Sequence, residues 1–206
     1  MPGSSDFGKL YTALMITQLV DSGLIKTIID VGVGRGTYYE LLSPHLPQLD
    51  WTGVEVWAPY IDQFNLHNKY TKLINQDVRE INFEAEPQRD LAILGDILEH
   101  MPKSDAQKII NTILDKSRTV VISIPITHYP QDEINNNPFE KHIKDDWSHK
   151  EVLESFPHII TSYVHDHIGV YFLSRDIETT ATLKSIYPFV CDIVKKQLPN
   201  DQIRCF

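Results

Sequence analysis

The chain has 206 residues, of which 42% are hydrophobic and 23% are charged. These proportions are typical of a globular domain and exclude a fibrous or disordered protein, and the length fits one domain. The net charge of -9 disfavours nucleic acid as a partner, because nucleic-acid-binding surfaces are rich in Lys and Arg.

Two further features bear on the compartment. No uncharged apolar stretch approaches the roughly 20 residues that span a bilayer, and the N-terminus lacks the pattern of a signal peptide. The two cysteines, Cys191 and Cys205, have neither zinc-site nor disulfide-framework spacing. We therefore expect a cytoplasmic protein with no membrane partner and no metal site.

In chain order, apolar residues at helical spacing predict a helix over residues 6–22. A run rich in β-branched residues then predicts a strand over 25–33 that is buried on both faces. Further strands are predicted at 51–56, 73–74 and 91–94. A helix at 38–46 is predicted between the first and second strands, and a helix at about 60–69 between the second and third. Alternation of this kind is typical of a doubly wound α/β sheet.

The middle of the chain continues the alternation. Ser104 and Gln107 form a capping-box pattern, which predicts a helix that ends near Lys116. A strand at 119–124 follows. Residues 128–146 are then rich in Pro, Asn, Asp and His, which predicts a long loop.

The last part of the chain begins with a second capping box at Ser148 and Glu151. Two strands, 159–164 and 170–173, form a candidate antiparallel hairpin, and the tail has helical spacing broken at Pro188. The sequence therefore predicts an α/β fold: a doubly wound, mostly parallel seven-stranded sheet with an antiparallel final hairpin and helices on both faces.

The strongest motif is the glycine-rich run Asp30-Val31-Gly32-Val33-Gly34-Arg35-Gly36, at the carboxyl end of the first predicted strand. Glycines let the backbone turn sharply and approach a ligand closely, at the sheet edge where α/β folds bind nucleotides. The spacing is GxGxG, and Thr37 stands where a dinucleotide fingerprint has a final Gly or Ala. A nicotinamide-dependent dehydrogenase is therefore disfavoured.

Acidic residues end the next predicted strands. Glu55 ends the second strand, where an ionised carboxylate can accept hydrogen bonds from both hydroxyls of an adenosine ribose. Asp77 follows the third strand and could accept from the adenine amine, with Val78 packing beside the ring. The alternative for each acid is a solvated position at a strand end or in a loop.

Residues 25–175 resemble the class I (Rossmann-like) S-adenosylmethionine-dependent methyltransferases. The resemblance rests on the glycine-rich run, on Glu55 and Asp77, and on Asp96-Ile97-Leu98-Glu99-His100-Met101, which is similar to the Asp-x-x-Glu-His-hydrophobic segment of many small-molecule methyltransferases. It implies S-adenosylmethionine as cofactor and S-adenosylhomocysteine as product. The implied cofactor contacts are Asp30, Gly32 and Gly34 for the methionine part, Glu55 for the ribose, Asp77 and Val78 for the adenine, and Asp96 and Ile97 beside the sulfonium.

The resemblance implies that residues 1–206 form a single methyltransferase domain. We expect an N-terminal helix over 1–22, a Rossmann-like core over 23–175 and a C-terminal helical extension over 176–206. The apolar residues of the extension are candidates for a homodimer contact, and the alternative is that they pack onto their own sheet.

The acceptor has no motif of its own. Methyltransferases that act on base amines often have an Asn/Asp-Pro-Pro-aromatic motif after the fourth strand, where this chain has Asp96-Ile97-Leu98-Glu99. The expected function is therefore methyl transfer to a small-molecule or glycan-type acceptor. The alternatives are a catalytically silent, methyltransferase-like subunit that binds the cofactor or a partner protein, and, less favoured, an RNA or protein methyltransferase.

Methyl transfer needs no protein nucleophile, but a hydroxyl acceptor benefits from a general base. The candidates are Glu99, His100, His128 and His142. His128 and His142 lie in the long loop, and the alternative for each histidine is a polar loop or helix-end position without contact to substrate.

Overall fold

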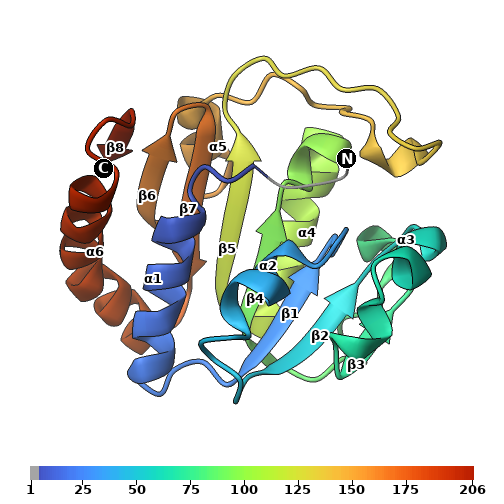
Figure 1. The fold of residues 1–206 in the computed structure, drawn as a ribbon, viewed down its shortest axis with the longest axis horizontal. Helices are drawn as coiled ribbons and strands as arrows, with labels where there is room; N and C mark the ends of the chain where they lie inside the picture. The colour runs from blue at the N-terminus through green and yellow to red at the C-terminus, as the bar shows by residue number, and fades with distance from the viewer. Residues whose placement is uncertain (1–4) are drawn as a thin grey trace.

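The computed structural model describes residues 5–206, so residues 1–4 of the predicted N-terminal segment lie outside the described part. The strands form one eight-stranded sheet in the order β3-β2-β1-β4-β5-β7-β6-β8 (Figure 1). The strands are β1 (Thr27–Val31), β2 (Asp50–Val54), β3 (Lys72–Ile74), β4 (Arg89–Gly95), β5 (Ser117–Pro125), β6 (Ile159–His165), β7 (Ile168–Ser174) and β8 (Ile203–Cys205). The first five pair in parallel, whereas β7, β6 and β8 pair antiparallel. The predicted mostly parallel sheet with an antiparallel hairpin is confirmed.

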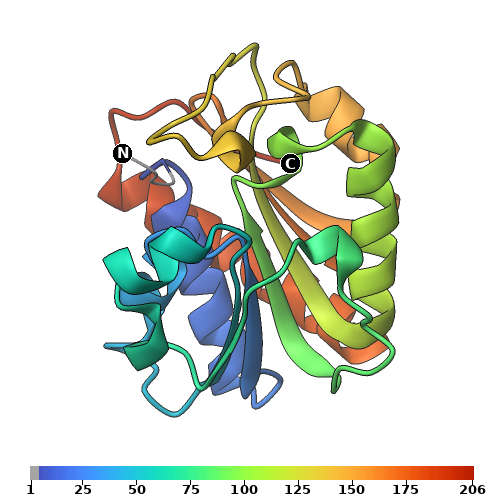
Figure 2. The same cartoon turned by 90° about the vertical axis from the view of Figure 1, so that its right-hand side faces the viewer.

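Helices cover both faces of the sheet, as predicted (Figure 2). They are α1 (Lys9–Asp21), α2 (Thr37–Leu42), α3 (Ala58–Gln63), α4 (Lys103–Lys116), α5 (His149–Ser155) and α6 (Ile177–Gln197), with short 3₁₀ turns η1 (Leu66–Asn68), η2 (Val78–Glu80), η3 (Leu98–His100) and η4 (Pro138–Glu140). One apolar cluster joins α1, α2 and α6 to the sheet, and a second joins α4 and α5 to the opposite face.

The central strands are mostly apolar because each face of the sheet is covered. In β4, Leu91 and Ile93 pack into the cluster with α1 and α6, while Ala92 and Leu94 pack into the cluster with α4. Alternate residues of a strand point to opposite faces, so a strand between two helical layers is expected to carry apolar residues on both faces. Burial of each such Leu or Ile side chain contributes about 1.5–3 kcal/mol.

Three expectations about the elements differ from the structure. The helix expected from Ser104 has its N-cap at Pro102, with no side-chain cap, so the predicted capping box there is wrong. The predicted break at Pro188 is also wrong, because α6 continues through this residue. An eighth strand, β8, pairs with β6 and was not predicted. By contrast, Ser148 caps α5 as predicted, accepting from the backbone N–H of Glu151.

Tertiary packing explains the uninterrupted α6. Val190, Cys191 and Val194, which follow Pro188 in the helix, are buried in the cluster that α6 shares with α1. A proline inside a helix costs about 3 kcal/mol, and we infer that burial of these side chains offsets that cost.

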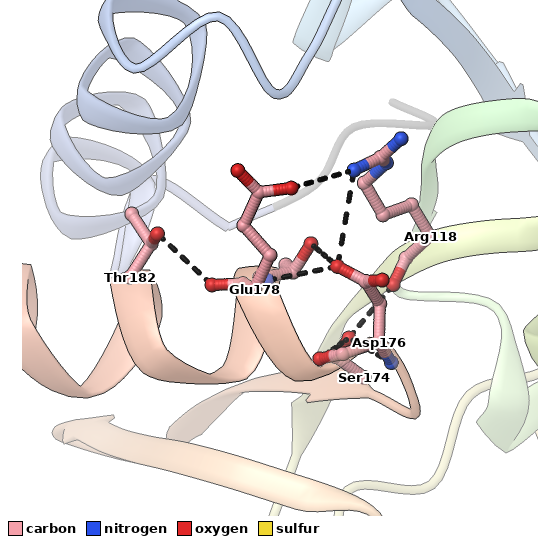
Figure 3. Close-up of polar contacts among 6 residues, drawn as sticks. Arg118, Ser174, Asp176, Glu178 and Thr182 are labelled. Carbon is pink, nitrogen blue, oxygen red and sulfur yellow. Dashed lines mark hydrogen bonds and ion pairs between the residues drawn. The ribbon is translucent and has the colours of Figure 1, made fainter.

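The start of α6 is joined by hydrogen bonds and ion pairs to the start of β5 and the end of β7 (Figure 3). The Asp176 carboxylate caps the helix by accepting from the backbone N–H and the hydroxyl of Thr179. Arg118, in β5, lies 3.8 Å from Asp176 and 3.5 Å from Glu178, and its carbonyl accepts from the Ser174 hydroxyl. These contacts attach the C-terminal helix to the core sheet.

The long loop between β5 and α5 passes over the carboxyl ends of the parallel strands (Figure 1). It folds back on itself through backbone hydrogen bonds from Tyr129 to the carbonyl of Asp145 and from His142 to the carbonyl of Gln131. Within residues 5–206, no helix has the length and apolar character needed to cross a bilayer.

Candidate functional site

A pocket of about 430 Å³ lies where the parallel strands β1, β2 and β4 end, beneath the long loop. This volume is in the usual range for a small-molecule site. Its lining includes the predicted residues Gly32, Gly34, Glu55, Asp77, Val78, Asp96, Ile97, Glu99 and His100, and also His142. Asp30 and His128 are not among the described residues that line it. The structure therefore gathers most of the predicted site from segments far apart in the sequence.

The glycine-rich loop forms one wall of the pocket. Gly32, Gly34 and Gly36 have φ angles of 69°, 53° and 86°, in the left-handed region that side chains disfavour. A Cβ atom on Gly32 would lie 2.5 Å from Cδ1 of Ile97, whereas a Cβ on Gly34 would meet no protein atom within 4 Å. Gly32 thus allows the approach of Ile97, and Gly34 keeps backbone open to a ligand.

Glu55 stands directly after β2 and is almost fully buried. Its two carboxylate oxygens accept from the backbone N–H groups of Gly34 and Trp57, each at 2.8 Å. Burial raises the pKa of Glu55 to about 7, although these two hydrogen bonds oppose the rise. Each oxygen retains a second lone pair, so the ionised carboxylate can still accept from two ligand hydroxyls.

Asp77 lies at the start of η2, and Arg79 holds its carboxylate. The backbone N–H and Nε of Arg79 both donate to Oδ1 at 2.9 Å. Hydrogen bonding from Arg79 keeps the pKa of Asp77 below its usual value, so the carboxylate stays ionised. Val78 is buried beside it. Arg79 also lines the pocket and was not predicted as a site residue.

Asp96 follows β4 with a φ of 55°, which turns the chain at the pocket floor. Its backbone N–H donates to the carbonyl of Ser123 in β5 at 2.7 Å. Oδ2 of Asp96 lies 3.9 Å from Nζ of Lys9, which donates a 2.8 Å hydrogen bond to the hydroxyl of Tyr38. The sheet and α1 thus both position Asp96.

Lys9 was not predicted as a site residue, because a lysine at the start of an apolar helix is usually solvated. It is 7% exposed. Burial lowers the pKa of Lys9, but Tyr38 and Asp96 together raise it above its usual value, so the ammonium group remains charged. The only sequence signal for it is a lysine that falls on the buried face of α1.

Asp30 lies in β1 and is not among the residues that line the pocket. It is 2% exposed and accepts a 2.7 Å hydrogen bond from the hydroxyl of Tyr70. Burial raises its pKa to about 7. In this structure Asp30 links β1 to the segment after η1, and its predicted contact with the methionine part of the cofactor stays a prediction.

The candidate bases differ in their surroundings. Burial, with the nearby charge of Asp96, raises the pKa of Glu99 well above its usual value. Burial and His142 lower the pKa of His100 to about 4. At neutral pH His100 is therefore neutral. The His128 side chain is 70% exposed and lies 3.8 Å from Asp145, outside the pocket.

The described lining is predominantly acidic. It contains five carboxyl groups and two guanidinium groups, namely Glu55, Asp77, Asp96, Glu99, Glu140, Arg35 and Arg79. Aromatic and amide side chains from the long loop, including Tyr129, Asn137 and Phe139, also line the pocket. This arrangement suits a ligand that carries hydroxyl groups and positive charge.

Residues 28–119 match the family model of a methyltransferase domain. No curated protein sequence matches the chain. Among solved structures, a S-adenosylmethionine-dependent methyltransferase from Clostridium acetobutylicum is similar, with a TM-score of 0.62 at 13% identity, over 84% of this chain and 93% of that one.

Two further similar structures were solved with a ligand. Magnesium protoporphyrin IX methyltransferase from Synechocystis, with bound S-adenosylmethionine, has a TM-score of 0.54 at 13% identity, over 81% of this chain and 78% of that one. The N-terminal domain of EvdMO1, with bound S-adenosylhomocysteine, has a TM-score of 0.56 at 11% identity, over 78% of this chain and 81% of that one. Residues 28–119 thus match a methyltransferase-domain model, and the chain has the Rossmann-like fold of these S-adenosylmethionine-dependent methyltransferase structures.

Proposed function

We propose that this chain binds S-adenosylmethionine in the pocket and transfers its methyl group to a small-molecule or glycan-type acceptor. The observation that carries the proposal is that Gly34, Glu55 and Asp96, from the ends of three neighbouring parallel strands, line one pocket. In α/β folds, nucleotide ligands bind at this edge of the sheet.

The lining fits the cofactor part by part. Gly34 leaves open backbone for the methionine part, and the Glu55 carboxylate offers two free lone pairs to the ribose hydroxyls. Val78 and Ile97 supply apolar surface for the adenine and the thioether chain, and Asp77 is an ionised acceptor near the adenine. The negative lining suits the positive sulfonium.

When bound, the cofactor would supply an electrophilic methyl group on its sulfonium, and Gly34, Glu55 and Asp96 would hold it in the pocket. The chain contributes position, because alignment of two reactants supplies much of the acceleration. His100, with a pKa of about 4, is a weak base and is better suited to accept a hydrogen bond from the acceptor than to hold its proton.

The acceptor side supports a small, neutral or cationic substrate. Glu99 and Glu140 line the pocket, where carboxyl groups outnumber guanidinium groups by five to two. A polyanion would meet these groups and the overall charge of -9. The loop residues Tyr129 and Phe139 provide ring surfaces against which a sugar or an aromatic acceptor can pack.

The test is calorimetric titration with S-adenosylhomocysteine. We expect 1:1 binding by the intact protein and about 10-fold weaker binding by Glu55→Ala, the effect of one charge-assisted hydrogen bond. Glu154→Ala, which removes an exposed acid on α5, is the matched control and should bind as the intact protein does. An intact, folded protein that does not bind contradicts the proposal.

The same preparation separates an enzyme from a silent subunit. S-adenosylmethionine with a labelled methyl group is incubated with the protein and fractionated small-molecule and glycan extracts. Label transfer by the intact protein that is lost in Asp96→Ala identifies an enzyme. Cofactor binding without transfer to any fraction favours the catalytically silent alternative, for which exposed Phe189 and Phe206 on the C-terminal extension offer a partner surface.

A further inference from the structure

We propose that Glu99, His100 and His142 form a binding site for one divalent transition-metal ion at the acceptor end of the pocket. One ligand atom from each of these side chains lies within 4.8 Å of the others, and all three residues line the pocket. The inference is about metal binding by these residues and stands without the cofactor; only its catalytic consequence rests on the proposed function.

Backbone hydrogen bonds build this cluster. Glu99 and His100 are neighbours in η3, which follows β4, whereas His142 comes from the long loop. The Glu99 carbonyl accepts from the backbone N–H groups of Ile143 and Lys144, at 2.8 and 2.9 Å. These bonds fix the loop against η3 and bring the His142 ring to 4.8 Å from the His100 ring, measured between centroids.

The two imidazoles are held as metal-binding histidines are. Nδ1 of His100 lies 3.2 Å from the carbonyl of Lys141, and Nδ1 of His142 lies 2.5 Å from the carbonyl of Tyr129. A carbonyl only accepts, so each Nδ1 carries the hydrogen, and in the neutral ring Nε2 keeps its lone pair. Metal-ligating histidines commonly donate their other ring N–H to a carbonyl or carboxylate in this way.

Glu99 provides an independent observation. Its side chain is 2% exposed, and Oε2 has no hydrogen-bond partner among residues 5–206. A buried polar atom without a partner costs about 1–3 kcal/mol. Hydrogen bonding within residues 5–206 does not account for this oxygen, whereas a cation held between Glu99 and the two histidines would satisfy it.

The donor set indicates the class of metal. Two imidazole nitrogens with one carboxylate oxygen suit Zn²⁺, Fe²⁺, Mn²⁺ or Co²⁺, whereas Mg²⁺ and Ca²⁺ prefer oxygen ligands alone. Three protein ligands leave coordination positions open, as in catalytic metal sites. Because the cluster faces the pocket beside Asp96 and Ile97, an oxygen atom of the acceptor is the natural further ligand.

The test is equilibrium dialysis of full-length, tag-free, chelator-treated protein against Zn²⁺ and, separately, Co²⁺, without cofactor. We expect one equivalent to bind, and Glu99→Gln and His142→Ala each to weaken binding by at least about 10-fold, since even outer-shell partners contribute that much. His67→Ala, which removes an exposed histidine of η1, is the control and should bind as the intact protein does.

Two readouts keep the outcome decisive. Co²⁺ absorption bands in the visible report nitrogen and oxygen ligands, whereas an intense near-ultraviolet thiolate band would assign the ion to Cys191 or Cys205 and overturn the proposal. Binding that Glu99→Gln and His142→Ala leave intact, or no binding at all, also overturns it. S-adenosylhomocysteine titration of folded His142→Ala tests the proposed function separately. Metal binding can be lost while S-adenosylhomocysteine binding remains, and the reverse is equally possible.

Discussion

The backbone N–H of Gly34 donates a 2.8 Å hydrogen bond to the Glu55 carboxylate, so the residue that ends β2 holds the loop that follows β1. The same carboxylate is the predicted ribose contact. Its second oxygen accepts from Trp57 and thereby fixes the start of α3 as well. One buried side chain therefore shapes the glycine-rich loop and lines the pocket.

Cofactor affinity should depend on pH through Glu55. The ionised form accepts from ribose hydroxyls, and the pKa in the free protein is about 7. The S-adenosylhomocysteine association constant should therefore rise by about 10-fold between about pH 6 and pH 8 as the ionised fraction increases. Calorimetry at a series of pH values measures this, and Glu55→Gln should give a flat profile. An equal pH dependence in the variant would contradict the assignment.

Stability should depend on pH through Asp30. In the unfolded chain its carboxyl loses a proton near the usual 3.8, but in the folded protein only near 7. The folded state binds more protons between these values, so Asp30 lowers the unfolding free energy as pH rises, by up to about 1.4 kcal/mol per unit. Asp30→Asn should remove this part of the slope. Urea denaturation at about pH 5 and pH 8 compares the two proteins, and parallel profiles would be inconsistent with the burial effect.

Two glycine substitutions should separate folding from binding. A Cβ on Gly95 would lie 2.0 Å from Cε2 of Tyr38, so Gly95→Ala should lower the unfolding free energy by about 1–3 kcal/mol. Gly34→Ala meets no protein atom within 4 Å and should cost about 1 kcal/mol, from its left-handed φ.

Gly34 lines the pocket and a Cβ there would meet no protein atom within 4 Å, so we expect the added methyl group to weaken S-adenosylhomocysteine binding about 10-fold, equivalent to about 1.4 kcal/mol. Thermal denaturation and calorimetry of both variants measure the two effects. A Gly34→Ala protein that binds as tightly as the intact chain would exclude a close approach of the ligand at this loop.

Lys9 should contribute to stability although it lies outside the predicted site. Lys9→Met keeps the apolar stem but removes the group that donates to Tyr38 and lies near Asp96. The loss should be about 2 kcal/mol, because both partners are largely buried. Lys26→Met, at an exposed position, is the control. Denaturant unfolding measures both, and equal small effects would show that the Lys9 ammonium is not required.

Most of the fold could be predicted because its signals are local. Apolar runs identify the central strands, and the glycine spacing identifies the loop after β1. The capping box at Ser148 identifies the start of α5. Where prediction was wrong, contacts from elsewhere outweighed local preference: α6 continues through Pro188 because it packs on α1, and three-residue β8 exists because β6 offers an unpaired edge.

By itself the sequence determined the order of the strands and helices from α1 to α6, because periodicity is a property of short segments. It also identified Gly32, Gly34, Glu55, Asp77 and Asp96 at the strand ends, because the motifs that contain them are equally local. Only the tertiary structure decided that Asp30 turns to Tyr70, that Lys9 reaches Tyr38 and Asp96, and that His142 meets Glu99 and His100. Those contacts join side chains from distant segments, and the packing of α1 and the hydrogen bonds that clamp the long loop to η3 bring them together.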